Sequence, residues 1–107
     1  MSNVAEVTDA TFDQLVLGSP KPVLVDYWAD WCAPCRQLSP IIDELARDYS
    51  DKVTFLKLDT NANPVTPTNQ QVLSLPTIQI YSGGQLVKSM QGGKTKMALL
   101  RALEEFI

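Results

Sequence analysis

Short apolar runs alternate with stretches of helical spacing along this chain. The apolar and β-branched runs predict five strands, at residues 4–7, 22–28, 53–58, 77–81 and 85–90. Apolar positions three and four apart predict three helices, at residues 9–17, 34–50 and 94–106. The Gly83-Gly84 pair between the last two strands is typical of a hairpin turn.

Local signals refine these elements. Thr8 is the expected N-cap of the first helix, which ends at residues 18–20. Pro40 lies inside the second helix and is expected to kink it. Prolines limit any helix between residues 59 and 75 to short pieces. The inner face of the last helix is predicted to consist of Met97, Leu100, Leu103 and Phe106.

The order of the elements predicts the fold class. A strand–helix–strand unit implies parallel pairing, whereas the hairpin implies antiparallel pairing. We therefore expect an α/β fold in which a central mixed five-stranded sheet is flanked by helices on both faces. A chain of 107 residues has room for one domain, so we expect a single domain over residues 1–107.

Composition and charge exclude several classes of function. Hydrophobic residues make up 45% of the chain, which is typical of a globular protein. A net charge of −3 argues against binding to nucleic acid or to an anionic membrane. No apolar run has membrane-spanning length, and the first twenty residues resemble neither a signal nor a transit peptide, so a cytoplasmic monomer is expected. The absence of histidine removes imidazole-based catalysis and metal ligation, and no metal site is expected.

The two cysteines are the strongest chemical feature. Cys32 and Cys35 follow a predicted strand and stand at the start of a predicted helix. A helix N-terminus favours an anion, by up to ~2 kcal/mol, and so stabilises the thiolate, which is the nucleophile in disulfide exchange. Pro34 fits the first helical turn and stiffens the loop between the sulfurs. A redox-active dithiol is the favoured interpretation.

Three other interpretations of this pair are open. A structural disulfide closing so small a loop would stabilise the fold by only ~2 kcal/mol. A zinc site would need two further ligands, and the chain has no third cysteine and no histidine. Two inert buried thiols would leave the position at a helix start and the adjacent Trp31 without an explanation.

An ordered set of motifs resembles the thioredoxin family over essentially the whole chain. The matching segments are residues 23–36, Pro40-Ile41, Lys57-Leu58-Asp59, Asn63-Pro64, Leu75-Pro76-Thr77, Gly83-Gly84 and Gly92. The resemblance implies the thioredoxin fold and a dithiol–disulfide cycle. Cys32 would attack a protein disulfide, and Cys35 would resolve the mixed disulfide. A thioredoxin reductase would restore the dithiol with electrons from NADPH, and no cofactor would be bound.

The resemblance also assigns roles to residues around the pair. It implies that Asp26 exchanges a proton with Cys35 and that Lys57 tunes Asp26. A structural carboxylate paired with Lys57, and a lysine that only extends to the surface, are the alternatives. Pro76 is expected to follow a cis peptide bond. The residues expected to bind substrate are Trp31, Pro34, Leu75, Pro76 and Gly92, with Trp28 and Pro40 as structural support.

Some positions depart from the family pattern. Ala33 replaces the more usual glycine between the cysteines, where together with Pro34 it is expected to tune the redox potential. Gln70-Gln71 replaces an aromatic–glycine pair, and Gln91 makes the groove next to Gly92 more polar. A binding module that does not use its dithiol, and an oxidant or isomerase on the same fold, remain the alternatives to a reductase.

Overall fold

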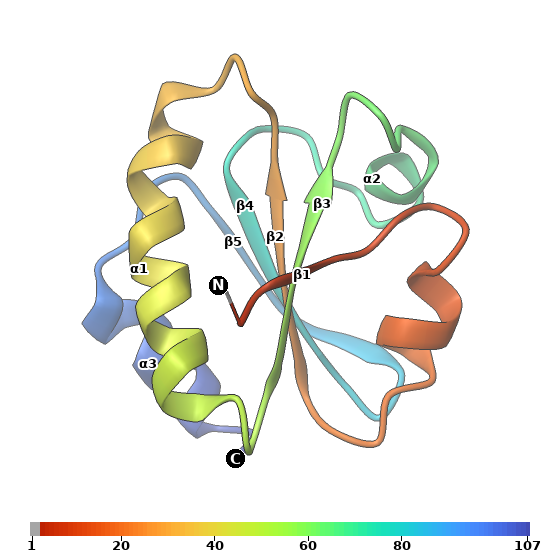
Figure 1. The fold of residues 1–107 in the computed structure, drawn as a ribbon. Helices are drawn as coiled ribbons and strands as arrows, with labels where there is room; N and C mark the ends of the chain where they lie inside the picture. Colours follow the sequence, from red (N-terminus) through yellow and green to blue (C-terminus); the bar gives the residue numbers. More distant parts are fainter. Residues whose placement is uncertain (1–2) are drawn as a thin grey trace.

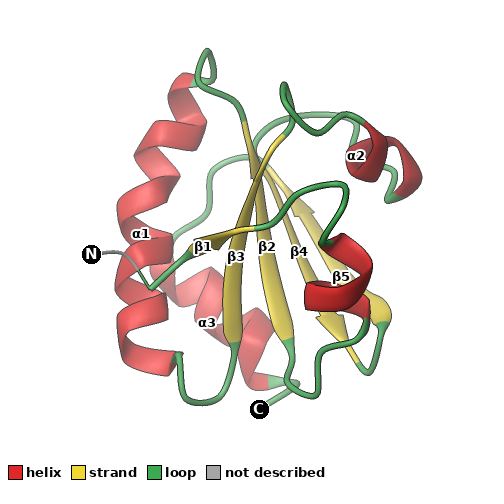
Figure 2. Cartoon of the chain, turned by 45° about the vertical axis from the view of Figure 1, so that its right-hand side comes forward, coloured by secondary structure: helices red, strands yellow, loops and turns green. Residues whose placement is uncertain are grey.

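The computed structural model describes residues 3–107 and has a mixed sheet between two layers of helices (Figures 1 and 2). The elements are β1 (Ala5–Glu6), η1 (Asp13–Leu17), β2 (Val23–Trp28), α1 (Ala33–Tyr49), β3 (Thr54–Asp59), α2 (Val65–Asn69), β4 (Thr77–Ser82), β5 (Gln85–Gln91) and α3 (Lys96–Glu104). The strands lie in the order β1-β3-β2-β4-β5. β1, β3 and β2 are parallel, and β4 and β5 are antiparallel to their neighbours, which confirms the predicted mixed sheet.

Alternating side chains of the three central strands, β2, β3 and β4, enter two separate cores. Leu24 on β2 packs with the buried residues of α1 and α3, on the side of the sheet shown at the left of Figure 1. Val25 and Tyr27 point the other way and pack with Val16 of η1. Because Asp26 follows the parity of Leu24, it lies on the face that α1 covers. The sheet thus directs the carboxylate of Asp26 toward the side covered by α1, the helix whose first turn contains Cys35.

The first predicted helix, at residues 9–17, is wrong in its amino-terminal half. The side chain of Thr8 accepts a hydrogen bond from the backbone of Thr11 at 3.3 Å, and the two hydroxyl oxygens lie 3.1 Å apart. The backbone N–H of Thr8 donates in return to the hydroxyl of Thr11 at 2.9 Å, which is a reciprocal capping pattern around a turn at residues 9–11. The helix begins only after that turn. The helical segment is confined to η1, where Gly18 donates to the carbonyl of Asp13 at 2.8 Å in the wider π-type pattern.

The last helix begins later than predicted, and its inner face differs from the prediction at one position. Leu103 is buried and Leu100 and Phe106 pack against the core, as expected. Thr95 is its N-cap and accepts from the backbone of Ala98 at 3.1 Å. Met97, expected inside, is 56% exposed, whereas Leu99 is fully buried. A strict spacing of three residues drifts away from the 3.6-residue turn, so the true stripe includes Leu99 instead. None of the helices within residues 3–107 has both the length and the apolar character needed to span a membrane.

Candidate active site

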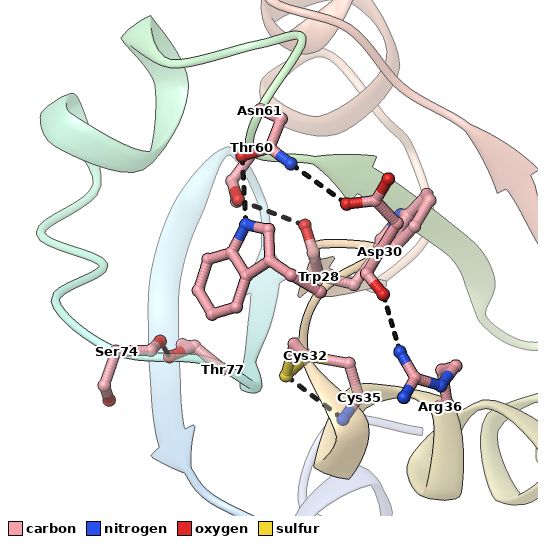
Figure 3. The surroundings of a disulfide bond; sticks show 10 residues. Trp28, Asp30, Cys32, Cys35, Arg36, Thr60, Asn61, Ser74 and Thr77 are labelled. Carbon is pink, nitrogen blue, oxygen red and sulfur yellow. Dashed lines mark hydrogen bonds between the residues drawn. A yellow bond between two sulfur atoms is a disulfide. The ribbon is translucent and has the colours of Figure 1, made fainter.

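Cys32 is the N-cap of α1, at the point where the chain leaves the end of β2. Its sulfur accepts a hydrogen bond from the backbone N–H of Cys35 at 3.2 Å (Figure 3). The two cysteines form a disulfide with their Cα atoms 5.3 Å apart, and both side chains are buried. Pro34 stands in the first turn of α1, as expected. An N–H donor and the helix dipole therefore both act on Cys32, which is the arrangement that stabilises a thiolate.

Polar contacts hold the loop that precedes Cys32. Arg36 donates to the carbonyl of Asp30 at 2.6 Å, and the amide of Asn61 donates to the carboxylate of Asp30 at 3.2 Å (Figure 3). The indole N–H of Trp31 donates to the side-chain oxygen of Asn61 at 3.2 Å. Sequence reasoning missed Asn61 because it lies about thirty positions away from the motif, and no local pattern marks it.

Asp26 is buried behind Cys35, with 5% of its surface exposed. It borders a cavity of about 140 Å³ that is lined by Asp26, Trp28, Cys35, Arg36, Ser39 and Lys57. Burial raises the pKa of Asp26 from 3.8 to about 7; the charge of Lys57 lowers it, and that of Asp43 raises it further. A carboxyl group with this pKa exchanges protons readily near neutral pH.

Two residues that line this cavity each have a buried polar atom without a hydrogen-bond partner among the residues that the structure describes. The two atoms are the Oδ1 atom of Asp26 and the indole Nε1 atom of Trp28. A buried polar group without a partner is costly unless it serves a function or binds water. Trp28 also packs against the apolar cluster of Ala29 and the two cysteines.

The segment before β4 forms one side of the site. Leu75 packs against the cysteine cluster, and the bond between Leu75 and Pro76 is cis, as expected. The backbone N–H of Gly92 donates to the carbonyl of Pro76 at 2.9 Å, and Gly92 has a φ of +81°, which favours glycine. Trp31 is 67% exposed. The structure thus brings Leu75, Pro76 and Gly92 together beside the disulfide.

Two surface hollows flank the disulfide. One, of about 210 Å³, is lined by Trp31, Thr60, Pro67, Val72, Leu73, Ser74 and Leu75. The other, of about 280 Å³, is lined by Pro34, Gln37, Leu38, Ile41, Gly93, Lys94 and Thr95. Leu73, which is 87% exposed, was not expected at the site. Pro40 lies within α1, beyond Cys35.

The described residues contain no group of three or more histidine, cysteine, aspartate or glutamate side chains that could hold a metal ion. The groups that the site offers are the disulfide, the buried carboxyl group of Asp26 and the N-terminus of α1. Together they can exchange thiols for disulfides and move one proton.

Comparisons with known proteins agree with this site. The family model described as Thioredoxin matches residues 3–105. The chain is 44% identical to Thioredoxin 1 of Nostoc sp. over the full length of both proteins. It is 46% identical to Thioredoxin of Mycobacterium tuberculosis over 99% of this chain and 91% of that protein. It is also 47% identical to the Bifunctional thioredoxin reductase/thioredoxin of Mycobacterium leprae, over 95% of this chain and 22% of that protein.

These relatives cover the whole chain, and the cysteine pair lies at disulfide distance where a thiol–disulfide oxidoreductase needs it. The protein is accordingly a disulfide reductase of the thioredoxin type. The five-stranded sheet, the cysteine pair at the start of α1 and the family match over residues 3–105 lead to one conclusion: the chain belongs to the thioredoxin family.

Proposed function

We propose that Cys32 is the attacking nucleophile in the reduction of protein disulfides. The observation that carries this assignment is the N-cap position, where the N–H of Cys35 points at the sulfur of Cys32. The Cys32 thiolate attacks one sulfur of the substrate disulfide, a new S–S bond forms, and the other substrate sulfur leaves as a thiolate. The helix end favours the ionised form of the attacking thiol, because the dipole and the free N–H groups stabilise a negative charge there.

Cys35 is the resolving thiol. Its thiolate attacks the sulfur of Cys32 in the mixed disulfide, the second substrate sulfur leaves, and the Cys32–Cys35 disulfide forms. Two electrons thereby pass from the dithiol to the substrate, which is reduced while the protein is oxidised. This step needs Cys35 to lose its proton in a buried position, where burial opposes ionisation.

Asp26 accepts that proton. It lines the same cavity as Cys35, and burial raises its pKa to about 7, so near neutral pH part of the population is ionised and able to act as a base. Lys57 borders the cavity from β3 and favours the ionised form of Asp26. Ala33 and Pro34 stand between the sulfurs in the first turn and tune the potential by restricting the backbone of that turn.

The substrate docks on the groove formed by Trp31, Pro34, Leu75, Pro76 and Gly92, with Trp28 and Pro40 supporting it from within the fold. The exposure of Trp31 and the position of Leu75 against the cysteines support this surface. The backbone of Leu75 pairs with an extended substrate segment in the manner of an added strand.

A thioredoxin reductase is the proposed partner that restores the dithiol, with NADPH as the electron source. The support for it is the Mycobacterium leprae relative, whose name joins a thioredoxin reductase to a thioredoxin in one protein. No bound cofactor takes part, because the cysteine pair itself carries the electrons. The protein acts as a single-domain monomer in the cytoplasm, a compartment that keeps such a dithiol reduced.

Trapping of mixed disulfides tests the order of attack. A Cys35→Ser variant should retain protein substrates as mixed disulfides through Cys32, because the resolving thiol is gone. The matched Cys32→Ser variant should retain none. Trapping by Cys32→Ser instead of Cys35→Ser would overturn the assignment.

Two further measurements separate the alternatives to a reductase. Equilibrium with a glutathione series should give a reducing potential, since a potential near that of secretory oxidants would make the protein an oxidant or isomerase. The double variant Cys32→Ser with Cys35→Ser should lose all disulfide reduction. A binding module would keep its biological activity after that double replacement.

A further inference from the structure

A chain of buried polar side chains crosses the face of the sheet that η1 and α2 cover. The hydroxyl groups of Tyr27 on β2 and Tyr81 on β4 are hydrogen-bonded at 2.9 Å, and the hydroxyl of Tyr81 donates to the amide oxygen of Gln79. All three side chains are at most 1% exposed. Burial raises the pKa of Tyr81 to about 12, so its phenol stays protonated and able to donate.

The nitrogen of the Gln79 amide bonds to residues outside β4. This Nε2 atom donates to the backbone carbonyl of Gln70 at 3.0 Å and to the hydroxyl of Ser89 on β5 at 3.3 Å. Gln70 is the C-cap of α2 and directly follows its last residue, Asn69. Since Gln79 belongs to β4, one buried amide ties the end of α2 to the sheet, across the whole segment that leads to Pro76 (Figure 1).

That segment carries one wall of the hollow beside Trp31. Val72, Leu73 and Leu75 all line it. Directly after the held carbonyl, Gln71 has a φ of +59°, a conformation that side chains other than glycine rarely adopt. The course of the wall therefore depends on a turn that is unfavourable by itself and that needs external contacts to persist.

Packing alone does not explain a glutamine at position 79. It is paired across the sheet with Val25, and the hydrophobic cluster on this face also includes Leu56 and Leu58. Burying an amide among them is costly unless its hydrogen bonds are made, and an apolar side chain would fill the place without that cost. The bond that its oxygen accepts from Tyr81 stays within β4, whereas both bonds that its nitrogen donates reach other elements, so the amide nitrogen orders the α2–β4 segment relative to the sheet.

We propose that Gln79 is a positioning residue for protein substrates, holding the Gln70 carbonyl so that residues 71–75 form a fixed docking wall beside Trp31. The inference rests on the proposed function of the dithiol and concerns binding only. Gln79 lies on the face of the sheet opposite Asp26 and touches neither cysteine. It affects the binding of a folded protein substrate, whereas the reactivity of the cysteine sulfurs does not depend on it.

A comparison of KM and kcat tests the proposal. In a Gln79→Leu variant, the KM for a protein disulfide such as insulin should rise about two- to tenfold, the effect of losing one hydrogen bond, while kcat stays unchanged. The rate constant with hydroxyethyl disulfide, too small to reach the wall, should also stay unchanged. A Gln79→Met variant, which keeps the length but lacks the donor, should behave alike if Gln79→Leu folds poorly.

Two matched controls keep the bond to Gln70. Tyr81→Phe removes the donor to the amide oxygen, and Ser89→Ala removes the second acceptor, so neither should raise KM. Amide exchange at Val72, whose N–H donates to Pro67 at 2.8 Å, should accelerate in Gln79→Leu and remain slow in both controls.

The proposal is wrong if Gln79→Leu and Gln79→Met leave KM unchanged. It is equally wrong if the controls raise KM by the same factor, or if reactivity with hydroxyethyl disulfide falls in parallel, since either result indicates a general structural role. Failure of the proposed function would be distinct, because the unaltered protein itself would then fail to reduce insulin.

Discussion

Asp26 and Lys57 are register partners on the neighbouring parallel strands β2 and β3, and both side chains line the cavity behind Cys35. The two effects on the carboxyl group oppose one another. Burial disfavours the ionised form, and the lysine charge favours it. Burial is the stronger effect, which leaves the pKa of Asp26 at about 7. The position of a lysine one strand away thus sets how basic the proposed proton acceptor is.

Replacement of Lys57 should raise the pKa of Asp26. In a Lys57→Met variant the favourable charge is gone while burial remains, so the pKa should move above its value of about 7. Carboxyl-carbon NMR titration of the oxidised protein measures it directly. Lys52→Met, at an exposed position before β3, is the control and should leave the pKa unchanged. A fall of the pKa in Lys57→Met would contradict this account of the site.

Asp26 should make the folded protein less stable as the pH rises. Its pKa is 3.8 without the fold and about 7 within it, so the folded state binds the proton more tightly. Below about pH 4 both states are protonated and the shift has no effect; between about pH 4 and 7 stability is lost; above about pH 7 the full cost applies. Three units at about 1.4 kcal/mol each give up to about 4 kcal/mol.

An Asp26→Asn variant removes that titration. Its free energy of unfolding, measured by urea denaturation of the oxidised protein, should exceed that of the unaltered protein by an amount that grows from about pH 4 to 7 and then levels off. The exposed Asp51→Asn variant should show no such growth. A stability difference that is constant over this pH range would refute the raised pKa.

Gln71→Gly should stabilise the fold. Gln71 has a φ of +59°, which costs a residue with a Cβ atom roughly 1–2 kcal/mol, whereas glycine adopts it freely. The greater freedom of glycine in the unfolded chain takes back about 0.4–1 kcal/mol. We expect a net gain of about 0.5–1 kcal/mol in urea unfolding. The neighbouring Gln70→Gly variant is the control and should lower stability, because Gln70 has a negative φ.

Asp9→Ala should destabilise α2 from a distance. The carboxylate of Asp9 accepts from the backbone of Val65 at 3.1 Å and of Thr66 at 2.8 Å, which satisfies the first turn of that helix. Loss of such a cap costs about 1 kcal/mol, measurable by urea unfolding at neutral pH. Asp13→Ala, an acidic residue of η1, is the control for the loss of a charge.

The effect of Asp9 should disappear in acid. Burial opposes ionisation of Asp9, but the hydrogen bonds from Thr66 and Val65 outweigh it and hold the pKa below 3.8. A lowered pKa gives stability that is present above the unfolded value and is lost as the pH falls through the folded one. The difference between the unaltered protein and Asp9→Ala should therefore shrink below about pH 4. A difference that persists there would show that the contact is not ionic.

Helix ends show where prediction from local patterns stopped. The start of α1 at the cysteine pair followed from a strand, a proline and an amphipathic stripe that are contiguous in the chain. The first predicted helix is too long, because residues 9–11 form a turn between Thr8 and Thr11 and the helix starts after it. Met97 was placed inside, although the docking of α3 on the sheet turns Leu99 inward. Tertiary packing determines which of two neighbouring faces of a helix is turned toward the core.

The α/β order, the parity that buries Asp26 and the position of Cys32 at a helix start follow from local sequence patterns, because each depends on residues close together in the chain. The contacts of Asn61 with Trp31, of Asp9 with α2 and of Gln79 with Gln70 could be found only in the folded protein. These contacts join residues that become neighbours only when the sheet and helices pack, and polar side chains give no periodic signal of their partners. The redox-active cysteine pair can thus be predicted from the sequence motif, whereas the distant polar contacts around it arise from tertiary packing.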